Sequence, residues 1–245
     1  MAKSYVIIPA YNEGPNLGVV LEQLRVLAST IPLAVIVVND GSRDNTAAEA
    51  ERFRSLMDLQ IVTHGVNQGV PLTFYDGLVT AAARAEPEDC IFIIEGDGTS
   101  DLAVLPEMAR RVYAGDDVVI ASRYIRGGGY LNFPLQRTWG SNLVNRFLSA
   151  FLQVRGITDY TIFYRAYRAE ALQRALKQQG PNFVTTRSFA ANLEVLLHVL
   201  PYSKSFSEVP LLYDYGKKKS TSKMNSFKTL REYSRLIVKR LLRKA

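Results

Sequence analysis

Three carboxylates, Glu95, Asp97 and Asp101, follow directly after an apolar run at residues 91–94. Such a run is typical of a strand buried on both faces, and ligands of open α/β sheets bind outside the carboxyl ends of the strands. Two hard oxygen ligands separated by one glycine suit Mg²⁺ or Mn²⁺ carrying a diphosphate. We therefore predict Glu95 and Asp97 as metal ligands, and Asp101, or Ser100 before it, as the cap of the following helix.

A second polar group follows the apolar run at residues 33–38. Asp40 stands at the end of this predicted strand, where a carboxylate can accept hydrogen bonds from a base or a ribose. The polar residues at 44–46 are typical of an Asx turn that caps a helix. This pattern predicts half of a mononucleotide site, with Asp40 as the candidate contact.

The elements that must position these side chains are strands alternating with helical segments. Apolar runs of strand length lie at residues 4–9, 33–38, 59–63, 91–94 and 117–121. Their spacing predicts an α/β fold with an open, twisted and mainly parallel sheet flanked by helices. No GxGxxG follows the first strand and no GxxxxGK[ST] occurs, so the dinucleotide-binding and P-loop classes lack support.

The chain beyond residue 125 has a different pattern. We predict a helix at 134–152, a β-rich segment at 159–168, a helix at 187–200 and a strand at 208–212. A last helix at 226–242 carries a broad apolar stripe opposite a basic face, which is typical of a helix on a membrane surface or against a partner. The same pattern fits a terminal helix docked on its own domain, and both interpretations stay open at this point.

Composition limits the class of protein and its partners. With 245 residues, 47% of them hydrophobic, the chain can bury one substantial core. A net charge of +7 favours polyanions such as nucleotide phosphates or an anionic membrane surface, and no motif supports binding of nucleic acid. Cys90 is the only cysteine, and His64 and His198 lack the spacing of a zinc site. With no signal peptide and no apolar run of membrane-spanning length, we expect a cytoplasmic protein.

Seven segments, in order along nearly the whole chain, resemble the family 2 glycosyltransferases of the GT-A fold. Within that family they look most like the dolichyl- or polyprenyl-phosphate hexose synthases, which use mannose or glucose. The segments are VIIPAYNE (6–13), VVNDGSRDNT (37–46), VNQGVPLTFYDG (66–77), IIEGDGTSD (93–101), ASRYIRGGG (121–129), DYTIFYRAYR (159–168) and STSKM (220–224). The resemblance implies a Rossmann-like GT-A catalytic domain at 1–225, followed by a basic amphipathic helix at 226–245.

The resemblance further implies an activity. It is the inverting transfer of a hexose from a GDP- or UDP-linked donor to a polyprenyl phosphate, with Mg²⁺ or Mn²⁺ as the cofactor. The enzyme would work at the cytoplasmic face of a membrane, which its C-terminal helix would contact. By position, the nucleotide-sugar would be bound by Pro9, Tyr11, Glu13, Asp40, Asn67, Gly69, Asp97, Lys217 and Lys223. The acceptor phosphate would be held by Arg123, Arg137 and Ser141, and these three residues, Asp97 and Asp159 form the predicted catalytic set.

The chemistry of the acceptor decides whether a base is needed. A lipid phosphate is mostly ionised at neutral pH, so it needs cations and donors that hold it in line rather than a general base. Ser141 lies one helical turn after Arg137, so both side chains can face one anion. For a hydroxyl acceptor a base becomes necessary, and Asp159 is the candidate. The alternative for Asp159 is a structural carboxylate that orients Arg165 or Arg168.

Several positions depart from the family pattern. Glu95 stands where the family usually has Asp, and Lys217 stands where it usually has Arg, which keeps the charge but loses the bidentate fork. Ile162 and Phe163 replace a small Ser-Gly pair, which points to a reshaped acceptor or sugar pocket. Two other functions therefore remain as alternatives: the same fold acting on a hydroxyl of a soluble or glycan acceptor, and an inert module that binds sugar-nucleotides or membranes.

Overall fold

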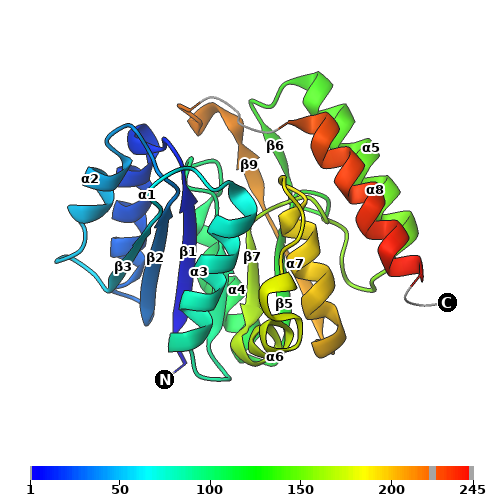
Figure 1. Ribbon diagram of the computed structural model, residues 1–245, viewed down its shortest axis with the longest axis horizontal. Coiled ribbons are helices and arrows are strands. Elements are labelled where there is room, and N and C mark those ends of the chain that lie inside the picture. Colours follow the sequence, from blue (N-terminus) through cyan, green and yellow to red (C-terminus); the bar gives the residue numbers. More distant parts are fainter. Residues whose placement is uncertain (1, 221–224, 243–245) are drawn as a thin grey trace.

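The computed structural model describes residues 2–220 and 225–242, and a seven-stranded sheet forms its centre (Figure 1). The strand order is β3-β2-β1-β4-β7-β5-β8, and only β7 runs antiparallel to its neighbours. The strands are β1 (Ser4–Ala10), β2 (Leu33–Asn39), β3 (Leu59–Thr63), β4 (Cys90–Ile93), β5 (Val118–Ser122), β7 (Arg165–Arg168) and β8 (Phe206–Pro210). The predicted α/β fold with a mainly parallel sheet is confirmed.

Strands β1 and β2 are buried along nearly their whole length. Burial on both faces explains why their sequences are continuous apolar runs and do not alternate. The register pairs Ala10 of β1 with Asn39 of β2, and Ile7 of β1 with Ile93 of β4. The three strands therefore end at one edge of the sheet, and the polar segments that follow them share that edge.

Helices cover both faces of the sheet (Figure 1). Helices α3, α6 and α7 contact one another on one face, and α4 packs against β4, β5, β7 and β8 on the other. The helices up to this point are α1 (Gly14–Leu27), α2 (Thr46–Glu51), α3 (Val70–Arg84), α4 (Leu105–Tyr113), α6 (Ala169–Gln179) and α7 (Ala191–Val199). In the described part of the chain, no helix has the length and apolar composition needed to cross a membrane.

Helices α5 (Leu135–Leu152) and α8 (Ser226–Leu242) lie side by side at one end of the molecule (Figure 1). Tyr233, Leu236 and Ile237 of α8 are buried in the hydrophobic core, whereas its Phe227 and Leu242 are exposed. One side of α8 is therefore docked on the domain, and the other side faces solvent. The division of the chain at residue 225 stays a prediction.

The second half of the chain differs most from its predicted elements. Helix α6 was not anticipated, and only residues 165–168 of the β-rich segment form a strand. The preceding residues are held in a loop because the Asp159 carboxylate accepts the N–H groups of Thr161 and Ile162, an alternative to strand pairing. The predicted strand at 208–212 is two strands, because β9 (Leu212–Asp214) leaves the main sheet to pair with β6 (Gly129–Leu131).

Candidate active site

The acidic loop, residues 94–101, follows β4 and carries Glu95 and Asp97. Asp97 is buried, and its Oδ1 accepts hydrogen bonds from the Thr99 N–H at 3.1 Å and the Thr99 hydroxyl at 2.5 Å. The Ser100 hydroxyl donates to Glu95. Asp101 caps the short helix at Leu102–Val104 by accepting the Ala103 N–H, which confirms its predicted role as an N-cap. The loop thus holds its two metal-candidate carboxylates by local hydrogen bonds.

Gly96 separates the two acids, and the space around it explains the absence of a side chain. A Cβ at this position would lie 3.1 Å from Ile8 Cγ2 and 3.4 Å from the Pro9 carbonyl oxygen. The acidic loop therefore passes close to the end of β1. Glu13, whose Cγ would lie 3.9 Å from the same Cβ, also belongs to this neighbourhood.

The Glu95 carboxyl has an unusual proton affinity. Burial and the neighbouring charge of Asp97 raise the pKa of Glu95 to about 7, although the hydrogen bond from Ser100 acts in the opposite direction. Two carboxylates forced together in a poorly solvated site repel each other, and a cation between them would relieve that repulsion. A positive charge next to the acidic loop would therefore stabilise its two carboxylates.

In the structure, that positive charge comes from Lys218. Its ammonium group donates a hydrogen bond to Asp97 Oδ2, and both side chains are largely buried. Lys218 follows the one-turn helix η4 (Tyr215–Lys217), which leads away from β9. Sequence reasoning missed this lysine, because its neighbour Lys217 matches the family position.

The two carboxylates of the acidic loop fit a divalent cation that takes its remaining ligands from substrate and water. In the described ranges 2–220 and 225–242, no cluster of three His, Cys, Asp or Glu side chains is arranged to hold a metal by itself. Mg²⁺ is commonly bound by one or two carboxylates, with substrate phosphates and water completing its shell. Glu95 and Asp97 fit a metal that arrives together with a diphosphate.

A buried ion pair lies on the other side of the site. Arg123, just after β5, donates from Nε and Nη2 to the two carboxylate oxygens of Asp159, each at 2.8 Å. Burial alone would raise the pKa of Asp159, but the Arg123 charge and hydrogen bonds more than offset it and hold the pKa below its ordinary value. Asp159 is completely buried and also accepts backbone N–H groups. A carboxylate with these contacts is poorly suited to accept a proton from a substrate.

Aromatic rings surround the Arg123 guanidinium. Its centre lies 5.5 Å from the Tyr124 ring, 5.1 Å from the Tyr130 ring and 5.7 Å from the Tyr213 ring, within the range of cation–π attraction. The Ser141 hydroxyl of α5 lies 2.9 Å from the Tyr130 hydroxyl and 3.1 Å from the Tyr124 hydroxyl. Ser141 and Arg123 therefore belong to one cluster, although 18 positions separate them in the numbering.

Tyr213 of β9 connects this cluster with the acidic loop. Its pKa is raised well above the ordinary value, chiefly by burial and then by the negative charges of Glu95 and Asp97. The next residue, Asp214, donates its N–H to the Thr99 carbonyl oxygen at 3.3 Å. The metal candidates and the Arg123 cluster are therefore parts of one site.

Arg137 lies at the start of α5, on the exposed side of the site. Its Nη1 donates to the Tyr215 hydroxyl at 2.7 Å, and its guanidinium centre lies 5.4 Å from the Tyr215 ring. Tyr215 belongs to η4, the same segment that leads to Lys218. Arg137 therefore approaches the site through an aromatic partner that sequence reasoning missed.

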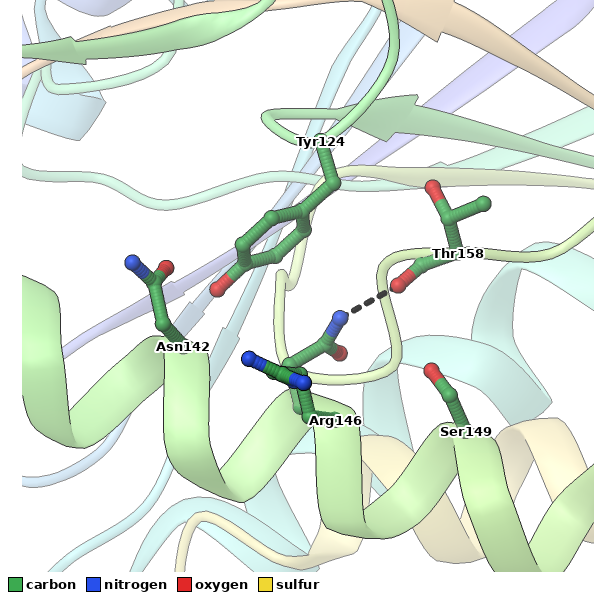
Figure 2. Close-up of a pocket in the computed structure, with 6 residues that line it drawn as sticks. Tyr124, Asn142, Arg146, Ser149 and Thr158 are labelled. Atoms are coloured by element: carbon green, nitrogen blue, oxygen red, sulfur yellow. Dashed lines mark hydrogen bonds between the residues drawn. The ribbon is translucent and has the colours of Figure 1, made fainter.

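A cavity of about 450 Å³ lies beside Tyr124, between α5 and the loop before β7 (Figure 2). Its lining residues are Tyr124, Asn142, Asn145, Arg146, Ser149 and Thr158. Asn145 fixes the loop, since it donates to the Thr158 carbonyl oxygen and accepts the Tyr160 N–H at 2.8 Å. From β8, Glu208 accepts the N–H groups of Thr158 and Asp159 at 2.8 and 2.9 Å. Asn145 and Glu208 thus hold Asp159 in place for Arg123.

Asp40, predicted to contact a base or ribose, is engaged by the protein itself. Its carboxylate accepts the N–H groups of Gln68 at 2.7 Å and Gly69 at 2.8 Å, ahead of α3, and lies 2.7 Å from His64 Nδ1. The other ring nitrogen of His64 lies 2.9 Å from Asp76. Asp40 is thus tied to the loop that carries Asn67 and Gly69, two further predicted donor contacts.

A family model described as "Glycosyl transferase family 2" matches residues 5–176. The chain belongs to glycosyl transferase family 2. The match covers the acidic loop, Arg123, Ser141, Asp159 and the strands that position them. The predicted family is therefore confirmed.

Relatives within this family have names that specify their reactions. A polyprenol monophosphomannose synthase of Mycolicibacterium smegmatis is 29% identical over 86% of this chain and 77% of its own length. A dolichol-phosphate mannosyltransferase of Pyrococcus furiosus is 25% identical over 96% of this chain and 62% of its own. An undecaprenyl-phosphate mannosyltransferase of Micrococcus luteus is 27% identical over 84% of this chain and 82% of its own length.

Solved structures of the same fold are more distant in sequence. Glucosyl-3-phosphoglycerate synthase from Mycobacterium tuberculosis, in complex with Mn²⁺, UDP and glucosyl-3-phosphoglycerate, matches with a TM-score of 0.65 at 14% identity, over 98% of this chain and 79% of that one. S. aureus TarS (residues 1–349) in complex with UDP-GlcNAc matches with a TM-score of 0.60 at 18% identity, over 96% of this chain and 65% of that one. These similarities confirm the GT-A fold.

Most of the predicted site residues that the structure describes gather in one region. Pro9, Tyr11 and Glu13 follow β1, next to the acidic loop, and Arg123, Ser141 and Asp159 form the adjacent cluster. Lys217 is exposed beside Lys218, and Lys223 lies outside the described residues. The proposed partners of Asp159 also differ, because Arg165 donates to the carbonyl oxygens of Tyr160 and Asn192 and Arg168 donates to that of Val112.

Proposed function

We propose that this family 2 enzyme transfers a hexose, with inversion, from a nucleoside-diphosphate sugar to a polyprenyl phosphate. One observation carries the proposal. On α5, Arg137 and Ser141 share their helix with a row of exposed apolar side chains spaced four residues apart: Leu135, Trp139, Leu143, Phe147 and Phe151. A phosphate joined to a long hydrocarbon needs cations and donors at one end and an apolar surface along the rest.

The exposure of this row, called here the α5 ridge, is large for apolar side chains. Leu135 and Trp139 are each 77% exposed and Leu143 is 72% exposed. Continuous apolar surface on a folded domain typically marks a site for a ligand, partner or membrane. The names of the relatives, which specify mannose and polyprenyl, dolichyl or undecaprenyl phosphates, also support a lipid phosphate as acceptor.

The proposed reaction forms a bond between a phosphate oxygen of the acceptor and the anomeric carbon of the hexose. The bond from that carbon to the diphosphate breaks, and the nucleoside diphosphate leaves with the electron pair. Arg123, Arg137 and Ser141 would bind and orient the acceptor phosphate, which is already ionised and needs no base. When bound at Glu95 and Asp97, Mg²⁺ or Mn²⁺ would neutralise charge on the departing diphosphate. Asp159 would act through Arg123, whose guanidinium it holds in position.

Membrane contact belongs to the same proposal. The exposed side of α8 carries the cations Lys228, Arg231 and Arg235 together with Phe227, and it lies beside α5. Each cation near an anionic surface contributes about 1 kcal/mol, and salt screens the attraction. We expect co-sedimentation with anionic vesicles that weakens with salt and with the double substitution of Arg231 and Arg235 by Gln. Unchanged binding by that variant would contradict a role for α8.

The test of the activity uses acceptors that differ either in the phosphate group or in the length of the prenyl chain. With Mn²⁺ and a panel of GDP- and UDP-hexoses, we expect transfer to a long prenyl phosphate and to a short one, and none to the matching prenyl alcohol. Trp139→Ser combined with Leu143→Ser should raise KM for the long acceptor and leave the short one unchanged. Leu56→Ser, at an exposed leucine outside the site, is the control. Transfer to alcohols or sugars in place of prenyl phosphates would contradict the proposal.

A further inference from the structure

The ion pair between Lys218 and Asp97 places an ammonium group at a predicted metal ligand. Lys218 donates to Asp97 Oδ2, while the other oxygen of Asp97 is taken by Thr99. The lysine and aspartate side chains are 14% and 8% exposed, so water screens this pair only weakly. A metal that binds Asp97 through Oδ2 needs the oxygen that the ammonium occupies.

The segment that carries Lys218 is anchored next to the acidic loop. Asp214 donates its N–H to the Thr99 carbonyl oxygen at 3.3 Å, accepts the Gly216 N–H at 3.0 Å and accepts from Asn132 Nδ2 at 2.9 Å. The Lys218 N–H closes the turn on the Tyr215 carbonyl oxygen at 3.2 Å. The backbone at Lys218 is therefore fixed at a short distance from Asp97, and the flexible four-carbon stem of the side chain can move the ammonium.

We propose that Lys218 is a built-in counter-ion that the divalent cation displaces, and that the displaced ammonium then binds the diphosphate of the donor. The proposal rests on the proposed function, because it assumes a nucleoside-diphosphate donor. Before the donor arrives, Lys218 neutralises Asp97. When metal and diphosphate enter together, the metal takes over Asp97, and the diphosphate offers new negative charge within reach of the released ammonium.

This exchange makes metal and nucleotide binding cooperative. A metal without nucleotide must break the ion pair and leave the lysine without a carboxylate partner, which opposes binding. A metal with a nucleoside diphosphate gains the contact between Lys218 and phosphate. Removal of the lysine charge should therefore strengthen the binding of metal alone and weaken the binding of nucleotide with metal, so the two effects have opposite signs.

The test is titration with Mn²⁺, followed by the electron paramagnetic resonance signal of the free ion and by calorimetry. Compared with wild type, Lys218→Met should bind Mn²⁺ alone about tenfold more tightly, which corresponds to about 1.4 kcal/mol. With saturating Mn²⁺, the same variant should bind GDP or UDP, whichever binds wild type, about tenfold more weakly. Lys218→Gln should behave in the same way and guards against an effect of the methionine side chain.

Two controls isolate the contact. Lys219→Met removes the same charge from the adjacent, exposed position and should leave both affinities unchanged. Asp97→Asn should abolish the binding of Mn²⁺ that Lys218→Met strengthens, which assigns the measured ion to this site. Thermal melting of each variant verifies that it is folded.

The results separate this proposal from the proposed function. Lys218→Met that binds Mn²⁺ no more tightly than wild type, or an equal gain in Lys219→Met, would overturn the counter-ion role. Failure of both wild type and Lys218→Met to bind Mn²⁺ alone would overturn it as well. Turnover of a prenyl phosphate by wild type is measured separately, and it can succeed whatever the titrations give.

Discussion

The two sides of the candidate active site, the proposed donor side and the proposed acceptor side, are held together in different ways. On the donor side, the acidic loop after β4 holds its two carboxylates by local contacts: Asp97 bonds Thr99 two residues away and Glu95 bonds Ser100 five residues away, and the Lys218 ion pair is added from 121 positions away. On the acceptor side, Arg123 bonds Asp159 across 36 positions, and Arg137 bonds Tyr215 across 78. The acidic loop is thus shaped by a local motif, and the acceptor side by pairs that only the complete fold brings together.

This difference has consequences for stability and for specificity. A local motif keeps its shape when a distant element changes, and its side chains remain available for a ligand. A long-range buried pair joins elements of the fold, so the loss of one partner leaves the other charge unpaired in a poorly solvated place. We therefore expect substitutions on the donor side to affect chemistry with little effect on folding, and substitutions in the acceptor-side ion pair to affect both.

The largest effect is expected for Asp97→Ala, on the donor side. The change removes a predicted metal ligand and should lower transfer by about 10²- to 10³-fold or more, a loss typical of a missing electrostatic contact to a developing charge. The melting temperature should change little, because the flexible stem of Lys218 can move its unpaired ammonium towards solvent. Asp101→Asn, in the same loop, is the matched control: Asn caps a helix about as well as Asp, so the variant should keep both its stability and its transfer activity. More than a few per cent of wild-type activity at saturating Mn²⁺ would contradict the metal assignment of Asp97.

Asp159→Asn tests the acceptor side. The substitution leaves the buried Arg123 guanidinium without its anionic partner, and we expect a loss of about 3–5 kcal/mol in the free energy of unfolding, measured with urea. Asp44→Asn, on the donor side, should cost less than about 1 kcal/mol, because the amide oxygen can still accept the Thr46 N–H. A variant that keeps wild-type stability and loses transfer would instead favour Asp159 as a base for a hydroxyl acceptor.

The same contrast explains how much the sequence could predict. The strands at 4–10, 33–39, 59–63 and 118–122 and the helix Leu135–Leu152 follow from apolar runs and helical spacing, which are local signals. The capping role of Asp101 and the position of the acidic loop are local as well. These features were predicted because the residues that determine them are neighbours in the chain.

Long-range pairs gave no such signal. Nothing near Lys218 in the sequence indicates that it, and not Lys217, reaches Asp97 across 121 positions. Glu208 gave no sign of its contacts with the loop at Asp159, and neither Tyr130 nor Tyr213 could be recognised as a partner of Arg123. The antiparallel β7 was also unforeseen, because strand direction depends on how the chain returns to the sheet.

Arg137→Ala and Ser141→Ala should have smaller effects, confined to the acceptor. A lost hydrogen bond to a charged group costs roughly 1.5–3 kcal/mol, which corresponds to about a 10- to 100-fold rise in the acceptor KM. The donor KM should stay within about twofold of wild type. Arg155→Ala, which removes an exposed arginine in the loop after α5, serves as the control. An unchanged acceptor KM in both Arg137→Ala and Ser141→Ala would argue against a phosphate-bearing acceptor.

The smallest effect is expected at His64, a donor-side residue that joins Asp40 and Asp76 from different parts of the chain. Burial lowers the pKa of His64, but hydrogen bonds and the charges of Asp40 and Asp76 more than offset this and raise the pKa above its ordinary value. The protonated ring can donate to both carboxylates at once, at 2.7 Å to Asp40 and 2.9 Å to Asp76. A raised pKa in the folded state means that the folded protein holds this proton more tightly than the unfolded chain.

The sign of the pH dependence follows directly. The stabilisation by His64 is complete below its unfolded pKa of about 6.5, and it declines as the pH rises through the higher folded pKa. His64→Gln should therefore lower the free energy of unfolding by about 1 kcal/mol more at pH 5.5 than at pH 9, measured with urea at both pH values. Asp76→Asn, which removes one of the two carboxylates, should reduce this pH dependence and keep part of it through Asp40. If the stability difference between wild type and His64→Gln is equal at both pH values, the ring contributes only as a neutral hydrogen-bonding group. The charge interaction of His64 with Asp40 and Asp76 would then add nothing to the stability of the donor side.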